Sequence, residues 1–208
     1  MKPVIGIDID DVLAAHAEAF VAFSNEWWGT HLSVEDFDEH WAQVWQVDQE
    51  ETERRADIFH GSGIIGRYRH YDEALPVLLE LSKDFRLLAM TSRRQRVEEE
   101  TRAWLDKHYR GIFEDIKFAG IWDDPTGVER QKLTKADLFV TNKVKFVIDD
   151  QLKHCVAAAE KGIHALLFGG YKWNQTEEHL SSLITRVADW AAVKDYFEDF
   201  KNKGLPDK

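Results

Sequence analysis

Four carboxylates of the 208-residue chain stand at the ends of short apolar segments, which are typical of buried strands. Asp8 and Asp10 follow the first segment, and Asp149 and Asp150 end a later one. Alternate residues of an extended chain face the same way, so Asp8 and Asp10 can converge on one site. Clustered carboxylates repel one another unless a cation or a proton neutralises them, and their oxygens suit Mg²⁺. Either pair alone could cap the following helix, but both pairs at one sheet edge predict a magnesium site.

A hydroxyl pair and a lysine would add a site for a phosphate group. Thr91 and Ser92 end another apolar segment, and hydroxyls with backbone N–H groups at a helix N-terminus bind anions. Lys135 opens a helical stretch ahead of the second acidic pair, so its side chain can reach back to the strand ends. Lys132 is a rival for this role, and Lys143 is a weaker one. Taken alone, a Thr-Ser pair is more often a helix cap, and a lysine is usually a solvated surface residue.

The elements that must position these groups alternate between strands and helices. Short apolar segments predict strands over residues 3–9, 85–91, 144–150 and 165–168, with a weaker one over 116–119. Helical patterns cover residues 71–83, 96–108, 152–161 and 176–200. This alternation predicts an α/β fold with a Rossmann-like parallel sheet and helices on both faces. Ligands of such sheets bind beyond the carboxyl ends of the strands, where the polar residues above lie.

Residues 14–70 interrupt this alternation just after the first strand. They hold helical patterns and no strand candidate, which predicts an inserted all-helical unit. We therefore expect a discontinuous core over residues 1–13 and 71–208, and a small helical cap over residues 14–70. The helices of the cap are expected over residues 14–28, from the N-cap Ser33, and over residues 48–60.

Composition limits the partners of this chain. The net charge of −11 argues against a nucleic-acid polymer or an anionic membrane, although a small phosphate can still bind through a metal. No apolar run approaches the ~18 residues of a membrane span, and the N-terminus has no apolar signal region. The single cysteine, Cys155, excludes an internal disulfide and sits in an apolar helical pattern typical of a packed residue. We therefore expect a cytoplasmic protein.

The order of these groups along the chain resembles that of the haloacid dehalogenase superfamily of phosphotransferases. The first motif of that superfamily, Asp-x-Asp-x-(Thr/Val), matches residues 8–12 (DIDDV). The second motif matches AMT, which ends at Thr91, and Lys135 is matched to the third. The fourth matches VIDD, residues 147–150. Four motifs in this order on four elements form a specific signal.

Further segments are similar to the 5′(3′)-deoxyribonucleotidase-like branch of this superfamily. They are Asn25–Thr30 (NEWWGT), Thr91–Arg93 (TSR), Thr101–Leu105 (TRAWL), Lys135–Leu138 (KADL), Ile148–Asp150 (IDD) and Tyr171–Asn174 (YKWN). The similarity covers most of the chain, including the helical insertion. Two departures suggest a different substrate. Residues 70–74 (HYDEA) stand where the branch often has Pro-Gly-Ala, and Asp11 stands where many members have Gly.

The resemblance implies a phosphomonoesterase that works through a phosphoaspartate. Asp8 would attack phosphorus, and Asp10 would protonate the leaving oxygen and then deprotonate the hydrolytic water. The first role requires a protonated Asp10, a state that neighbouring carboxylates would favour by raising its pKa. Thr91, Ser92 and Lys135 would hold the phosphoryl oxygens and offset charge in the transition state.

Mg²⁺ is the cofactor that the resemblance implies. A phosphate dianion repels an anionic nucleophile, so a metal is needed to bridge them. The ligands would be Asp8, the main-chain carbonyl of Asp10, and Asp150 or Asp149, the last two either directly or through water.

Aromatic side chains crowd into the helical insertion, which would close over the site and set specificity. Phe20, Phe23, Trp27 and Trp41 are candidate substrate contacts, because a ring can stack on a nucleobase. Packing is the competing interpretation. Trp41 and Trp45 are four residues apart on one helical face, and such stripes more often pack against a neighbour.

The leading hypothesis is a Mg²⁺-dependent 5′-nucleotidase that hydrolyses (deoxy)nucleoside monophosphates. The alternative keeps this chemistry but takes a sugar phosphate or another small phosphorylated metabolite. The Asp-x-Asp pattern and the inserted cap argue against a phospho-acceptor regulatory module. The presence of every motif residue argues against a binding protein without catalysis. Base preference, sugar preference and the choice between monomer and homodimer stay open.

Overall fold

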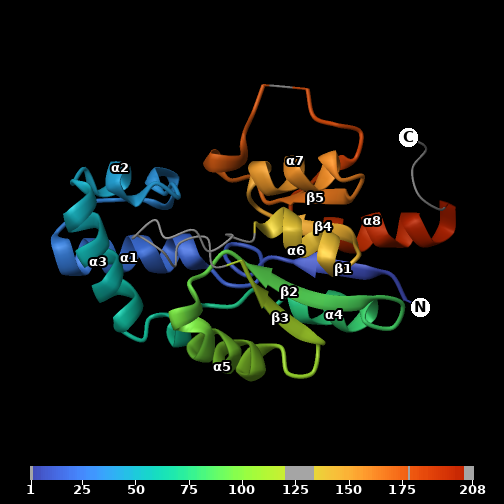
Figure 1. Cartoon of the computed structure of the whole chain (residues 1–208), viewed down its shortest axis with the longest axis horizontal. Helices are drawn as coiled ribbons and strands as arrows, with labels where there is room; N and C mark the ends of the chain where they lie inside the picture. The colour runs from blue at the N-terminus through green and yellow to red at the C-terminus, as the bar shows by residue number, and fades with distance from the viewer. Residues whose placement is uncertain (1, 120–133, 178, 204–208) are drawn as a thin grey trace.

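A six-stranded parallel sheet forms the centre of the computed structural model, which describes residues 2–119, 134–177 and 179–203 (Figure 1). The strand order is β3-β2-β1-β4-β5-β6, and every neighbouring pair is parallel. The strands are β1 (Val4–Ile7), β2 (Arg86–Thr91), β3 (Asp115–Phe118), β4 (Val144–Asp149), β5 (His164–Phe168) and β6 (Ile184–Val187). Because these strands run the same way, the residues that follow β1, β2 and β4 meet at one edge of the sheet.

Helices cover both faces of this sheet. They are α4 (Ala74–Leu81), α5 (Glu98–His108), α6 (Lys135–Thr141), α7 (Leu152–Glu160) and α8 (Trp190–Lys203). Side chains of α4, α5 and α8 join Ile5 and Ile7 in one apolar cluster, whereas those of α6 and α7 join Val4 in another. Alternate residues of β1 thus enter opposite faces, and the predicted Rossmann-like α/β fold is confirmed. Across the described ranges, no helix has the length and hydrophobicity of a membrane-spanning segment.

Residues 14–70 form helices that lie beyond one end of the sheet, to the left in Figure 1. They are α1 (His16–Trp28), η1 (Val34–Asp36), α2 (Trp41–Trp45), α3 (Gln49–Gly61) and η2 (Ile65–Arg67), where η marks a 3-10 turn. Aromatic rings pack this region. The rings of Trp45 and Phe20 stack with centroids 5.0 Å apart, and Trp45 Nε1 donates to Ser24 Oγ at 2.9 Å. Helix α1 ends at Trp28, as predicted, and the next residue, Gly29, takes the left-handed conformation (φ 63°).

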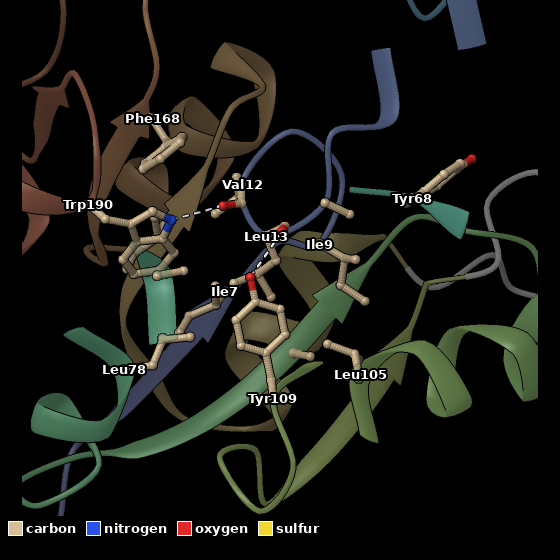
Figure 2. Close-up of a cluster of buried hydrophobic side chains, with 14 of the residues drawn as sticks. Ile7, Ile9, Val12, Leu13, Tyr68, Leu78, Leu105, Tyr109, Phe168 and Trp190 are labelled. Carbon is tan, nitrogen blue, oxygen red and sulfur yellow. Dashed lines mark hydrogen bonds between the residues drawn. The ribbon is translucent and has the colours of Figure 1, made fainter. Parts of the chain in front are cut away.

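Buried side chains anchor the turn after β1, which carries the first acidic residues (Figure 2). Trp190 Nε1 donates a hydrogen bond to the Val12 carbonyl at 3.0 Å. From the other side, the Tyr109 hydroxyl donates to the Leu13 carbonyl at 3.1 Å. Because all four residues are buried, these bonds satisfy backbone groups that water does not reach, and they hold the turn in place.

The predicted helix over residues 176–200 is wrong in its first half. Residues 184–187 form β6 at the sheet edge, and α8 begins only at Trp190. Ile184, Val187 and Trp190 are three residues apart, which is the spacing of a helix face. Pairing with β5 extends the chain here, so a tertiary contact overrides the local pattern. The five predicted strands are confirmed, with ends shifted by at most two residues.

The helix expected to begin at Ser33 is only the 3-10 turn η1. Ser33 donates to Asp36 Oδ2 from its backbone N–H at 2.9 Å and from its hydroxyl at 2.8 Å. The next residue, Phe37, is extended and buried, so the chain turns into the interior instead of continuing a helix. The third predicted helix is present as α3, and its N-cap Asp48 accepts from the Glu51 N–H at 2.9 Å.

Candidate active site

Three carboxylates meet where β1 and β4 end side by side. Asp8 follows β1, Asp149 ends β4, and Asp150 comes next. One oxygen of each carboxylate lies within 4.8 Å of the other two, and all three residues are buried. The structure thus brings together three of the four acids that the sequence places at strand ends.

Lys135 lies inside this acidic cluster. Its Nζ is 2.8 Å from Asp8 Oδ1 and 2.8 Å from Asp149 Oδ2, and the residue is only 2% exposed. Thr134 caps α6 by accepting a hydrogen bond from a backbone N–H of the first turn. The helix therefore begins at the residue whose side chain reaches the acids.

The two rival lysines are elsewhere. Lys143 precedes β4, at the end of that strand remote from the acids, and its backbone is left-handed (φ 55°). Lys132 lies outside the described residues. Lys135 is the lysine that the structure places at the acidic cluster.

The acidic cluster carries more negative charge than Lys135 can neutralise. Burial raises the pKa of Asp8 to about 7, against the opposing effect of the Lys135 ammonium. Burial, together with neighbouring carboxylates, raises the pKa of Asp150 well above its ordinary value. Asp8 Oδ2 and Asp150 Oδ1 accept no hydrogen bond from any described residue. Free carboxylate oxygens with a shortage of positive charge fit a hard divalent cation.

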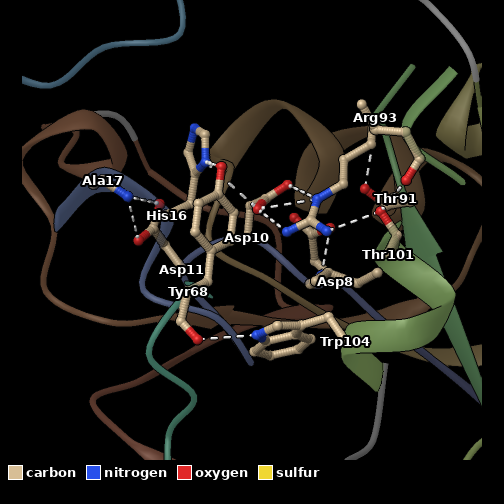
Figure 3. Close-up of polar contacts among 12 residues, drawn as sticks. Asp8, Asp10, Asp11, His16, Ala17, Tyr68, Thr91, Arg93, Thr101 and Trp104 are labelled. Atoms are coloured by element: carbon tan, nitrogen blue, oxygen red, sulfur yellow. Dashed lines mark hydrogen bonds and ion pairs between the residues drawn. The ribbon is translucent and has the colours of Figure 1, made fainter. Parts of the chain in front are cut away.

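Asp10 is not part of this group of three acids, and its carboxylate faces Arg93 (Figure 3). Arg93 Nη2 donates to Asp10 Oδ1 at 2.7 Å, and Nε donates to Oδ2 at 3.0 Å. Burial opposes ionisation of this carboxyl, but Arg93 and then His16 lower its pKa to about 2. The expectation that neighbouring carboxylates raise the pKa of Asp10 is therefore wrong, because a guanidinium is its direct partner.

The two hydroxyl residues at the end of β2, Thr91 and the following Ser92, differ in their contacts. Thr91 is fully buried, and its Oγ1 accepts a hydrogen bond from the Arg93 backbone N–H at 3.1 Å. The Ser92 hydroxyl oxygen is buried at a cavity wall and has no hydrogen-bond partner among the described residues. An unpartnered hydroxyl beside a candidate cation site fits a phosphoryl oxygen of a ligand.

A cavity of about 350 Å³ lies between these strand ends and the helices α2 and α3. Four of the predicted site residues line it, namely Asp8, Asp10, Ser92 and Asp150. The other three, Thr91, Lys135 and Asp149, are buried and are not among its described lining residues. Asp8, the candidate nucleophile, is therefore accessible from the cavity. Lys135 contacts Asp8 from the protein interior.

Only one of the four predicted aromatic contacts lines this cavity in the described structure. Trp41 does so. Phe20 and Phe23 are instead buried in the aromatic packing of α1, and Trp27 stacks on Phe23 with centroids 5.0 Å apart and faces solvent. In the described structure Phe20 and Phe23 therefore serve packing, whereas Trp27 is mostly exposed to solvent, and none of the three lines the cavity. Other rings on the cavity wall are His16, Phe37, His40, His60, Tyr68 and His154.

The loop after β5 supports the acidic cluster from the side. Trp173 Nε1 donates to Asp150 Oδ2 at 2.6 Å, and Asn174 Nδ2 donates to the Asp150 carbonyl at 3.1 Å. The Tyr171 hydroxyl donates to the Asp11 carbonyl at 2.8 Å. Gly169 begins this turn in the left-handed conformation (φ 78°), and a Cβ there would overlap the Tyr171 ring.

Comparison with known proteins identifies the family. The model of the family described as "5' nucleotidase, deoxy (Pyrimidine), cytosolic type C protein" matches residues 2–202. The chain belongs to this family. A comparison with curated proteins finds no match.

Solved structures support the fold of this nucleotidase family member. A haloacid dehalogenase-like family hydrolase from Streptococcus pneumoniae is 14% identical, with a TM-score of 0.68 over 94% of this chain and 98% of that chain. A predicted phosphatase from Clostridium acetobutylicum is 14% identical, with a TM-score of 0.70 over 96% and 99%. Protein Tyrosine Kinase A from Mycobacterium tuberculosis is 15% identical, with a TM-score of 0.70 over 94% and 97%. These likenesses show the haloacid dehalogenase-like fold.

Family membership makes the protein a hydrolase of phosphoric monoesters, and its substrate a small phosphorylated molecule. The resemblance seen in the sequence motifs is confirmed at the level of superfamily and branch. The buried acids of the site are compatible with the divalent metal that haloacid dehalogenase phosphatases generally use.

Three residues shape the site of this nucleotidase family member without having been predicted to do so. Arg93 holds Asp10, Trp173 holds Asp150, and Tyr68 hydrogen-bonds with its hydroxyl to His16 Nδ1 at 3.0 Å. Arg93 and Trp173 lie in segments that resemble the branch, but no spacing in those segments predicts a contact with an acid. Tyr68 lies far along the chain from every motif, so no local signal points to it.

Proposed function

We propose that this protein is a Mg²⁺-dependent 5′-nucleotidase that hydrolyses nucleoside monophosphates, deoxy forms included. The family match over residues 2–202 carries this proposal. The cavity supports it, because its volume of about 350 Å³ suits a small ligand. Trp41 adds a flat ring at the wall on which a base can stack.

Asp8 is the proposed nucleophile. Its Oδ1 is held by Lys135 at 2.8 Å, so Oδ2 is the oxygen that attacks phosphorus. As this bond forms, the bond from phosphorus to the leaving oxygen breaks, and the phosphoryl group passes to Asp8. The Ser92 hydroxyl donates to a phosphoryl oxygen. Thr91 positions the Arg93 backbone, and Lys135 positions the Asp8 carboxylate.

Asp10 is the proposed acid and base. In the first step its carboxyl gives a proton to the leaving oxygen, and the charge of the bound phosphate favours this protonated form. In the second step a water oxygen bonds to phosphorus, and the bond between phosphorus and Asp8 breaks. The proton of that water passes to the Asp10 carboxylate, which restores the enzyme and releases phosphate.

Mg²⁺ is the proposed cofactor. Asp8, Asp150 and the main-chain carbonyl of Asp10 would hold it, with Asp149 as a ligand directly or through water. When bound, the ion would offset the repulsion between the substrate dianion and the Asp8 carboxylate. In the absence of substrate, Mg²⁺ is expected to raise the melting temperature of the wild type and to have little effect on Asp150→Asn.

Residues 14–70 are proposed to act as a cap over a core of residues 1–13 and 71–208. Ion pairs join the two parts beside the cavity. Lys153 of α7 pairs with Glu39, and Arg96 Nη1 lies 2.6 Å from Asp57 Oδ1 of α3. These pairs are solvent-exposed and therefore weak, so the cap can open to admit substrate and close to exclude water.

Phosphate release from a panel of nucleoside monophosphates and sugar phosphates, with Mg²⁺, tests the proposal. The nucleotidase assignment predicts release from nucleotides, and none from the Asp8→Asn variant. Sugar phosphates are the second candidate, because Gln43, Gln49 and Glu53 line the cavity and can bind hydroxyl groups. Release from sugar phosphates alone would overturn the nucleotide assignment while leaving the phosphomonoesterase chemistry intact.

A further inference from the structure

The Arg93 guanidinium binds the Asp10 carboxylate in a bidentate ion pair (Figure 3). Nη2 donates to Asp10 Oδ1 at 2.7 Å, and Nε donates to Oδ2 at 3.0 Å and to Oδ1 at 3.3 Å. The Arg93 side chain is only 7% exposed. A bidentate pair of this kind sets both the position and the plane of the carboxylate, which a single contact does not do.

The guanidinium of Arg93 is itself held by neighbouring residues. Its Nη1 donates to Thr101 Oγ1 at 3.0 Å, and the Thr101 hydroxyl donates to the Val97 carbonyl at 2.8 Å. The Arg93 guanidinium also lies 5.3 Å from the ring centroid of Tyr68. Tyr68 is fixed in turn, because Trp104 Nε1 donates to its carbonyl at 2.9 Å. The support for Asp10 therefore extends from the loop after β2 into α5.

The Asp10 carboxylate, paired with Arg93, stands apart from the acidic cluster. The described acid oxygens that gather within 4.8 Å of one another belong to Asp8, Asp149 and Asp150, and Asp10 is not among them. Asp10 lines the cavity with its carboxylate turned to Arg93. A carboxylate kept out of the cation site remains available to take a proton, provided that it stays within hydrogen-bond reach of the water.

We infer that Arg93 is a positioning residue for hydrolysis of the phosphoenzyme. It holds the Asp10 carboxylate where that group removes a proton from the attacking water. The water oxygen then bonds to phosphorus, the bond between phosphorus and the Asp8 oxygen breaks, and its electron pair returns to the Asp8 carboxylate. This inference rests on the proposed roles of Asp8 and Asp10, and it is independent of whether the natural substrate is a nucleotide.

The test uses 4-nitrophenyl phosphate, whose leaving group departs without needing a proton. Arg93→Gln is expected to form the phosphoenzyme normally and to hydrolyse it slowly. Stopped-flow absorbance should then show a burst of about one 4-nitrophenolate per enzyme, followed by a slow steady state. Steady-state kcat and KM should fall together, on the order of 100-fold, while kcat/KM stays close to the wild-type value.

Three further variants refine the test. Arg93→Lys keeps one donor and should recover part of the steady-state rate. Thr101→Val keeps every charge but removes the hydroxyl that accepts a hydrogen bond from Arg93 Nη1. Its phosphoenzyme should be hydrolysed less slowly than that of Arg93→Gln, so its burst of 4-nitrophenolate should be smaller. Arg86→Gln is the matched control, since Arg86 stands at the other end of β2 in an exposed ion pair with Glu114, and it should leave the kinetics unchanged.

Equal losses of kcat and kcat/KM without a burst in Arg93→Gln would overturn the inference, since they indicate a general structural defect. In the Asp10→Asn background, Arg93→Gln should not slow phosphoenzyme hydrolysis any further. A further loss of that rate would also refute the inference. If Asp10→Asn itself keeps the wild-type rate of phosphoenzyme hydrolysis, the proposed role of Asp10 fails instead. If Asp10→Asn is slow and Arg93→Gln is not, only the role of Arg93 fails.

Discussion

Lys135→Met is expected to lower the free energy of unfolding by about 3–5 kcal/mol when no divalent cation is present. The substitution keeps the length and apolar stem of the side chain but removes its charge. Asp8 and Asp149 are then left buried without their common cation. The measurement belongs well above pH 7, because the pKa of Asp8 is about 7 with Lys135 present and rises further once that cation is removed.

The magnitude follows from the geometry of the two ion pairs. At 2.8 Å and an effective dielectric constant of about 20, each pair supplies about 6 kcal/mol of Coulomb attraction. The cost of removing the ammonium and both carboxylates from water offsets most of this gain. Removing one partner keeps the desolvation cost of the remaining carboxylates, which leads to the net loss of about 3–5 kcal/mol. For a chain of this size, the melting temperature should fall by roughly 6–20 °C.

Urea unfolding with EDTA, followed by tryptophan fluorescence, measures this loss. Lys201→Met is the matched control, because Lys201 Nζ lies 2.6 Å from Asp84 Oδ2 in an exposed ion pair. An exposed pair contributes little, so this control should lose less than about 1 kcal/mol. Mg²⁺ should recover part of the loss in Lys135→Met, because the ion restores positive charge to the acidic cluster.

Equal losses in Lys135→Met and Lys201→Met would refute the reasoning. That result would mean that burial does not amplify the interaction of Lys135 with the two acids. A loss that Mg²⁺ leaves unchanged would separately contradict the assignment of the acidic cluster as a cation site.

Further predictions concern Asp8, two tryptophans and one glycine. In EDTA, the unfolding free energy of the wild type relative to Asp8→Asn should fall as the pH rises from 3.8 to about 7. In this range the folded state keeps a proton that the unfolded state has lost, and a difference that is independent of pH would contradict it. Trp41→Ala should raise KM for nucleoside monophosphates about 5- to 100-fold in an enzyme assay, and it should also lower the melting temperature, because the Trp41 ring packs against Phe20 with centroids 4.9 Å apart. Trp45→Ala should instead cost about 3–5 kcal/mol in urea unfolding, because Trp45 is buried against Phe20. Gly169→Ala should cost about 1–3 kcal/mol, because φ is 78° and the new Cβ overlaps the Tyr171 ring; an unchanged melting temperature would contradict it.

Local patterns made most of the fold predictable. The five predicted strands are short apolar segments, most of them bounded by charged residues, and each lies within two residues of its predicted ends. The sixth strand, residues 184–187, escaped prediction because its apolar spacing also fits a helix. Its extended form comes from pairing with β5, and that contact has no local signal.

The site residues that lie at the carboxyl ends of strands could be predicted from the sequence. Asp8 follows β1, Asp149 ends the neighbouring parallel strand β4, and Lys135 opens α6, so their meeting follows from the topology. The aromatic contacts were less predictable. Phe20 and Trp41 belong to the same crowded stretch, yet one is buried in packing and the other lines the cavity.

The order of amino acids was enough to specify the α/β class, the acidic strand ends and the phosphatase motifs, because each depends on neighbours within a few residues. The state of Asp10 depended on the folded chain. Its carboxylate meets Arg93, 83 residues away, and this contact helps to lower its pKa to about 2. A pKa depends on burial and on the charges that surround a group in space. The burial of Asp10 and the charges around it are set only when distant segments of the chain pack together.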